Sequence, residues 1–188
     1  MKKSFRMTSV YLIFILLFSL CGCSQPPSQK KLLAVMDNED VFIGENGQEI
    51  YTNEFEYSEG YIAKPCEYAF VDFDSEGIDE LVVKISDNAT VYLVLRNSGE
   101  AVYGYLFYGK SLQTIKESGS FRQTGGADVN YYCHLSFDEN RYSVTYEAIC
   151  DDVADKYELY GEPCSVDEMQ VYAEEWSLLP DVTWVKVS

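Results

Sequence analysis

The most informative part of this chain runs from Val71 to Val83 and reads VDFDSEGIDELVV. Two apolar runs flank a turn that carries five carboxylates and a single glycine. Glycine gives a tight turn the backbone freedom it needs, and the β-branched residues on either side favour strands. We therefore predict two antiparallel strands, over residues 67–71 and 80–85, that are joined by a cation-binding loop.

The acidic side chains of this loop follow the spacing of a calcium site. Calcium takes about six to eight oxygen ligands, and Gly77, at the sixth position counted from Asp72, allows the sharp turn. Val83 stands where an EF-hand has its bidentate glutamate, so the motif is not an EF-hand. An acidic turn that merely connects two strands is the alternative, but carboxylates this close repel one another without a cation. The predicted calcium ligands are Asp72, Asp74, Glu76, Ile78 through its carbonyl, and Glu80.

The loop resembles the D-x-D-x-D-G-x-x-[DE] hairpins of integrin-type FG-GAP and VCBS repeats. The longer run YAFVDFDSEGIDELVV, from Tyr68 to Val83, resembles more closely a group of clostridial surface lipoproteins. This resemblance implies an architecture and a cell-surface location, but no activity. The chain departs from the pattern at Glu76, where aspartate or asparagine is usual. The likeness extends to residues 102–105, 119–121, 125–128, 131–132 and 182–184.

The N-terminal residues have the features of a bacterial lipoprotein signal. Three basic residues precede an apolar run over residues 10–20, which is too short to span a membrane. The run ends in Leu20-Cys21-Gly22-Cys23, which resembles the lipobox and implies lipid on Cys23. We expect a signal peptide over residues 1–22, a lipidated tether over 23–31 and a single domain over 32–188. The lipid would hold the domain on the extracytoplasmic face of the cell membrane of a Gram-positive-type bacterium.

The composition is strongly acidic, with 31 Asp and Glu against 14 Lys and Arg and a formal net charge of −17. This charge disfavours nucleic acid and anionic lipid headgroups as partners, because it repels both. Sixteen Tyr and ten Phe argue against a disordered chain. Residues 104–111 match the nucleotide-binding pattern G-x-x-x-x-G-K-S, but the bulky residues between the glycines predict a strand there and no bound nucleotide.

Four cysteines follow the predicted signal, and an even number outside the cytoplasm allows two disulfides. Four cysteines can pair in three ways, which the sequence does not distinguish. Cys150 with Cys164 closes the shortest loop and is the pairing we favour. No C-x-x-C motif is present, so neither a thioredoxin-type site nor a zinc knuckle is expected. The four cysteines are Cys66, Cys133, Cys150 and Cys164.

Several strand pairs are predicted along the chain. Turn residues such as Asn46-Gly47 and Ser98-Gly99 interrupt apolar runs and favour hairpins. Residues 131–137 and 142–148 alternate between apolar and polar, so Tyr146 and Ala148 should share one buried face. We expect these strands to form one twisted antiparallel sheet.

One helix is strongly indicated near the C-terminus. Ser165 and Glu168 form a capping box, and Pro180 ends the helix. A shorter helix is expected over residues 32–36. The fold class is therefore α+β, a single domain with the C-terminal helix packed on one face of the sheet. The apolar stripe of this helix consists of Met169, Tyr172, Ala173, Trp176 and Leu179.

No residue pattern identifies a catalytic site. His134, the single histidine, is expected on the outward face of its strand as a surface residue, and no G-x-S-x-G elbow accompanies it. We therefore predict a non-enzymatic surface lipoprotein that binds an unknown protein or glycan and contains a structural calcium loop. The alternative is a carbohydrate-active or other hydrolytic surface enzyme. An enzyme would show a pocket with convergent titratable groups, and a binding module would show an aromatic patch.

Overall fold

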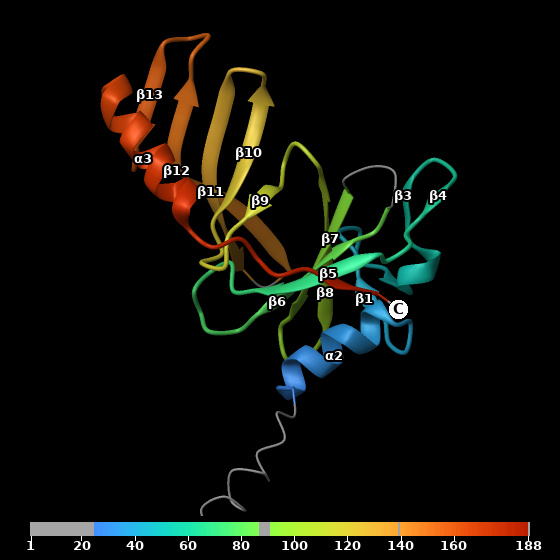
Figure 1. Cartoon of the computed structure of the whole chain (residues 1–188). Helices are drawn as coiled ribbons and strands as arrows, with labels where there is room; N and C mark the ends of the chain where they lie inside the picture. The colour runs from blue at the N-terminus through green and yellow to red at the C-terminus, as the bar shows by residue number, and fades with distance from the viewer. Residues whose placement is uncertain (1–24, 87–90, 139, 188) are drawn as a thin grey trace, which may run out of the picture.

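The structure is a computed structural model that describes residues 25–86, 91–138 and 140–187. The predicted signal peptide, residues 1–22, and the predicted lipidation site Cys23 lie outside the described residues. Within the described ranges, no helix has both the length and the apolar character needed to cross a membrane. The chain forms two main β-sheets, each with one helix packed on it (Figure 1).

The helices and strands are short, apart from one long hairpin. The helical segments are α2 (Pro27–Met36), the 3-10 helix η1 (Thr52–Glu54) and α3 (Val166–Leu178). The first sheet contains β1 (Phe42–Ile43), β2 (Glu49–Ile50), β5 (Glu67–Val71), β6 (Glu80–Lys84), β7 (Val91–Asn97), β8 (Val102–Tyr108) and β15 (Val185–Lys186). The second sheet contains β9 (Gln113–Ile115), β10 (Phe121–Gly126), β11 (Val129–Asp138), β12 (Arg141–Asp151), β13 (Lys156–Leu159) and β14 (Glu162–Pro163). A separate hairpin consists of β3 (Glu56–Ser58) and β4 (Tyr61–Ile62).

The first sheet has the strand order β15-β5-β6-β7-β8-β1-β2 and is buried on both faces. Its neighbours are antiparallel except that β1 runs parallel to β8. Val82 and Val94 face the core shared with the second sheet, whereas Leu81 and Leu93 face the core beneath α2. This two-sided burial explains why β6 and β7 are almost continuously apolar.

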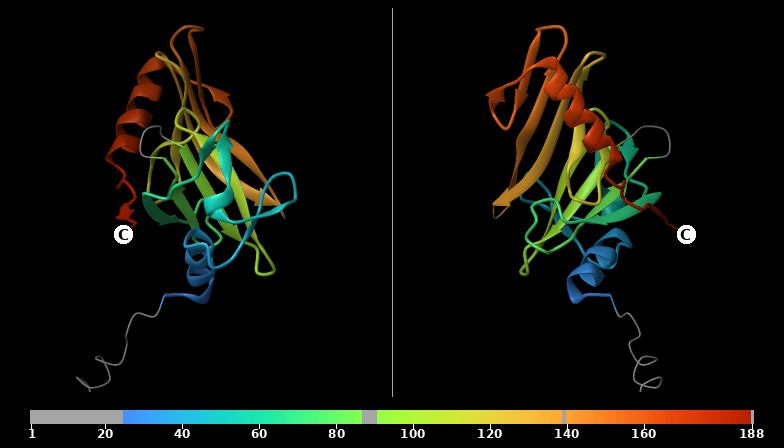
Figure 2. Two further views of the ribbon diagram at one scale, coloured as in Figure 1. Left: turned by 90° about the vertical axis from the view of Figure 1, so that its right-hand side faces the viewer. Right: turned by 60° about the vertical axis from the view of Figure 1, so that its left-hand side comes forward.

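The second sheet has the order β14-β13-β12-β11-β10-β9, and its β11–β12 hairpin extends beyond the first sheet (Figure 1). Cys133 and Leu135 face the core between the two sheets. Tyr132 lies on the opposite face, where it packs with Met169 and Trp176 of α3. Figure 2 shows the two helices at separate ends of the molecule, with α3 beside the extended part of the second sheet.

A buried lysine attaches the end of α3 to the second sheet. The Lys116 side chain is 3% exposed, and its Nζ donates to the carbonyl oxygens of Ser177 at 3.2 Å and Leu179 at 2.9 Å. The same ammonium group pairs with Asp181 at 2.7 Å and lies 4.6 Å from the ring centroid of Trp176. A cation at this position satisfies carbonyl groups that the helix itself leaves without partners.

The α+β fold class and the C-terminal helix are confirmed. The predicted capping box is present, since Ser165 Oγ accepts from the Glu168 amide and the Glu168 carboxylate accepts from the Ser165 amide. The strands divide between two main sheets rather than forming one, because the β11–β12 hairpin packs across β7 and β8 and is not an extension of their sheet. Helix α2 begins at Pro27, so part of the segment predicted as a tether is helical. Proline is well suited to a first helical turn.

A β-bulge changes the predicted alternation of β12. Tyr132 pairs with Ala148, but the next residue, Cys133, pairs with Tyr146, so Glu147 is an extra residue in β12. The bulge reverses the face on which the following residues lie. Ala148 consequently packs with α3 and does not share the face of Tyr146, contrary to the alternation expected from the sequence.

Candidate functional site: an acidic loop at the junction of the sheets

The acidic loop is held between two well-paired strands, as predicted. Strands β5 and β6 pair from Glu67 opposite Lys84 to Val71 opposite Glu80. Two loop residues adopt positive φ, Ser75 at 60° and Gly77 at 77°. A side chain at Gly77 would meet no atom within 4 Å, so its conformation, rather than the available space, favours glycine there.

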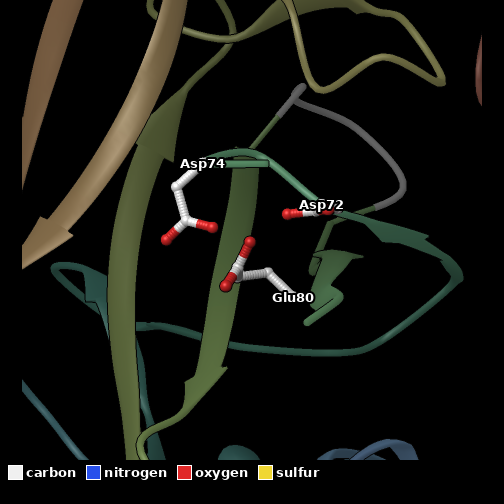
Figure 3. Close-up of side chains that lie close together, drawn as sticks. All are labelled: Asp72, Asp74 and Glu80. Carbon is white, nitrogen blue, oxygen red and sulfur yellow. The ribbon is translucent and has the colours of Figure 1, made fainter. Parts of the chain in front are cut away.

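Three carboxylates converge inside this loop. Oxygen atoms of Asp72, Asp74 and Glu80, one from each residue, all lie within 4.8 Å of one another. Figure 3 shows the three side chains pointing toward a common space. Asp72 and Asp74 extend from the loop, and Glu80 extends from the first position of β6. In the part of the chain that the structure describes, this is the one group of His, Cys, Asp or Glu side chains with such an arrangement.

Backbone amides hold two of these carboxylates in place. Asp72 Oδ2 accepts from the Gly77 amide at 2.9 Å, and Asp74 Oδ1 accepts from the Glu76 amide at 3.2 Å. The second oxygen of Asp72, Oδ1, is buried and has no hydrogen-bond partner. An orphaned carboxylate oxygen in a buried position is costly, because it has lost water without gaining a donor or a cation.

Glu80 is the most deeply buried acid of the group, with 1% of its surface exposed. Its Oε2 accepts from the Phe73 amide at 3.1 Å. The pKa of Glu80 is raised to about 8, chiefly by burial and also by the charges of Asp74 and Asp72, while the Phe73 amide and Arg96 oppose this rise. Without an added cation, Glu80 is therefore largely protonated at neutral pH.

Arg96 on β7 supplies the nearest positive charge. Its Nη1 lies 2.6 Å from Asp74 Oδ2, its Nη2 lies 3.3 Å from Glu76 Oε2, and its guanidinium lies 4.5 Å from the ring centroid of Phe137. The arginine therefore links the loop to the second sheet. The sequence analysis did not identify Arg96, although it is the one basic residue of β7 and follows five buried residues.

Two further contacts attach the loop to its surroundings. Gln29 of α2 donates from Nε2 to Asp79 Oδ2 at 2.7 Å. Gly119, in the turn between β9 and β10, has a φ of 82°, and a Cβ there would lie 2.2 Å from the Asp72 carbonyl oxygen. The loop is thus packed between α2, the first sheet and the second sheet, which places it at the junction of the two halves of the molecule.

The converging oxygens are chemically suited to calcium, and they come from three of the five residues predicted as its ligands. Hard carboxylate oxygens suit calcium, and no His or Cys ligand that would favour a transition metal takes part. The structure brings together Asp72, Asp74 and Glu80 of the five predicted ligands. Glu76 instead has a side chain that is 56% exposed and lies 3.3 Å from Arg96. Ile78 has a 45% exposed side chain.

In the part of the chain that the structure describes, no disulfide joins Cys133, Cys150 and Cys164, so the favoured pairing of Cys150 with Cys164 is absent. Cys133, Cys150 and Cys164 are free thiols. Cys150 is paired with Tyr157 across β12 and β13, and the Cys164 amide donates to the Tyr157 carbonyl from the other side. Tyr157 therefore separates the two cysteines that we expected to pair. Cys66 Sγ contacts the Lys84 carbonyl at 3.3 Å.

His134 lies in a groove rather than on an open surface. It projects on the same side of β11 as α3, and its Nε2 is 3.2 Å from Glu147 Oε1. The β-bulge directs Glu147 into this position, where its Oε2 also accepts from Tyr172 Oη at 2.9 Å. Burial raises the pKa of Tyr172, and its hydrogen bond to Glu147 raises it further. The sequence pattern did not reveal this cluster, because a bulge leaves no local signature in the alternation.

The nucleotide-binding pattern forms a strand, as predicted. Gly104 is part of β8, and a Cβ there would lie 2.3 Å from the ring of Phe42. Glycine at position 104 therefore leaves room for Phe42 of β1 to pack against β8. Comparison of the chain with protein-family models, with curated proteins and with solved structures finds no match.

Proposed function

We propose that this protein is a lipid-anchored, extracytoplasmic binding module whose fold is stabilised by calcium at the β5–β6 loop. The lipoprotein part rests on the signal-like N-terminus and on the resemblance around Cys23. The calcium part rests on one structural observation. Asp72, Asp74 and Glu80 converge within 4.8 Å, and Asp72 Oδ1 is buried there with no partner.

A calcium ion would supply what this cluster lacks. It would bind Asp72 Oδ1, favour the ionised form of Glu80, and share Asp74 with Arg96 or displace it. The ion would have to complete its coordination with water or backbone oxygens, which is the arrangement of weak extracellular sites with Kd values of about 10⁻⁴–10⁻³ M. Calcium would be structural in this role, because the loop joins three parts of the fold.

Thermal unfolding with and without calcium tests the proposal. At 10 mM calcium and a Kd of about 1 mM, binding should stabilise the protein by about 1.4 kcal/mol and raise Tm by roughly 3–6 °C. Asp72→Asn should abolish this increase. Asp79→Asn is the matched control, because Asp79 bonds Gln29 and lies outside the convergent group, so it should retain the increase. A wild-type Tm that does not change with calcium would contradict the proposal.

A hydrolytic enzyme is a second candidate, and the His134–Glu147 contact is the observation that favours it. A carboxylate that orients a histidine is part of many general-base arrangements. In the described residues, however, no hydroxyl or thiol donates to His134, and Glu147 is already bonded to Tyr172. The binding role is therefore preferred. Hydrolysis of a chromogenic ester or glycoside that is lost in His134→Ala would reverse this preference.

A further inference from the structure

A groove follows α3 where the helix lies over β12 and the β13–β14 turn. Two depressions of about 350 and 460 Å³ adjoin along the helix and share Tyr160, Tyr172 and Glu175, and we call them together the α3 groove. His134 and Glu147 lie at the end near the helix C-terminus. The groove contains no residue of the acidic loop, so it is separate from the candidate calcium site.

Tyr160 lines the groove and has an unfavourable backbone conformation. Leu159 pairs with Glu162, which leaves Tyr160 and Gly161 as the two central residues of the turn, with φ of 53° and 83°. Turns of this pattern favour asparagine and glycine at their first central position, and a bulky residue is an outlier there. The hydrogen bond from the Tyr160 amide to the Glu147 carbonyl, at 2.7 Å, fixes the turn to β12.

Packing does not account for a tyrosine at this position. Its side chain is 71% exposed and meets the Tyr172 ring edge-on, at 6.3 Å between centroids. A strained and exposed aromatic residue beside a concave surface is a recurring feature of ligand sites. The ring is therefore available to stack against a bound group.

The acidic residues around the groove favour a positively charged ligand. Glu147 and Glu175 line one depression, and Asp167 and Glu168 line the other, against the single basic residue His134. The chain as a whole carries a formal charge of −17, which attracts cations and repels anions. Aromatic rings next to carboxylates bind guanidinium and ammonium groups by stacking and by ion pairing.

The length of the groove favours a peptide over a small amine. From Asp167 to Leu179 the helix advances about 18 Å, which matches about five residues of extended chain. We propose that the α3 groove binds an extended basic segment of a partner protein. Tyr160 stacks on an arginine or lysine of that segment, and Glu175 pairs with its charge. This gives a partner class to the binding role proposed above, but it depends on none of the calcium ligands.

A pair of labelled peptides tests the proposal on the purified full chain. A fluorescein-labelled hexapeptide of alternating arginine and leucine should bind in fluorescence anisotropy, and its glutamate–leucine counterpart should not. Tyr160→Asn should weaken binding at least tenfold while leaving Tm unchanged or higher, because asparagine suits the turn. Tyr61→Asn is the control, since Tyr61 is 63% exposed in the β3–β4 hairpin on the other side of the molecule (Figure 1).

A second pair of variants distinguishes binding in the groove from general attraction to the negative charge of the protein. Glu175→Gln should weaken binding of the basic peptide several-fold. Glu174→Gln makes the same charge change on the same helix but outside the groove, and it should leave binding unchanged. Equal effects of the two, equal binding of both peptides, or full binding by Tyr160→Asn would overturn the proposal. Binding of chitohexaose in place of the basic peptide would overturn it in favour of a glycan site. None of these results depends on whether calcium changes Tm.

Discussion

The first sheet and the extended half of the second sheet are built under different constraints. The first sheet is covered by α2 on one face and by the second sheet on the other, so Leu93 and Val94 are both fully buried. The extended half of the second sheet is covered by α3 on one face, while Tyr146, on the other, is 46% exposed. The central strands β6 and β7 of the first sheet are buried on both faces, whereas the single helix on the second sheet leaves a groove along its edge.

The two acidic clusters of the molecule differ in the same way. Glu80 lies in the buried junction, lacks a sufficient counter-charge, and has a raised pKa. Glu147 lies in the groove, with 29% of its side chain exposed and both of its oxygens in contact with neighbouring side chains. We propose a small cation for the first arrangement, whereas the second lies in the α3 groove, for which we propose a ligand from outside the chain.

The largest expected effect concerns the independence of the extended half. Trp176→Ala removes a ring that packs on Tyr132 and hydrogen bonds to Ser120, and should cost about 3–5 kcal/mol. Because these contacts are confined to the α3 side, hydrogen exchange should accelerate in α3 and β13 while β6 and β7 remain protected. Leu93→Ala, in the first sheet, should instead reduce protection in both sheets. Uniform loss of protection in Trp176→Ala would show that the two regions unfold together.

The junction between the two regions can be broken at Gly119. Alanine there combines a positive φ with a Cβ 2.2 Å from the Asp72 carbonyl oxygen, and should cost about 3 kcal/mol, a decrease in Tm of roughly 6–12 °C. Gly99→Ala is the control, because Gly99 also has a positive φ but open space around it, and it should cost about 1 kcal/mol. Equal decreases in Tm would mean that the contact with the loop has no importance.

A pH-dependent effect is expected in the calcium-free protein. The unfolded chain releases the Glu80 proton near pH 4.5, whereas the folded protein retains it up to about pH 8. The stability that this group contributes is therefore complete below pH 4.5 and is lost as pH rises toward 8. In a chelator, Tm of the wild type should fall across this interval relative to Glu80→Gln, which has no such proton. A constant difference between the two proteins would contradict the raised pKa.

Local patterns in the sequence predicted a large part of the fold. The β5–β6 hairpin appears with the expected strands, and the capping box at Ser165 and Glu168 forms as predicted. The G-x-x-x-x-G-K-S pattern is a strand, as its bulky residues indicated. These features succeed because turn residues, caps and alternating burial act between residues that are near one another in the sequence.

The sequence identified part of the candidate site but not its surroundings. Asp72, Asp74 and Glu80 converge because one hairpin positions all three. Glu76 does not join them, and Arg96 approaches from another strand. The α3 groove was not predicted at all, because it depends on a bulge in β12 and on a strained turn at Tyr160.

What this chain encodes locally is its hairpins, its C-terminal helix, its acidic loop and its strong negative charge. Each of these follows from the chemistry of neighbouring residues. The division of the strands into two sheets, the contact of Arg96 with the loop, the burial of Glu80 and the groove beside α3 were decided only when distant segments packed together. Burial and pairing between distant residues depend on the whole fold, and so the burial of Glu80 and the unpartnered oxygen of Asp72 became visible only in three dimensions.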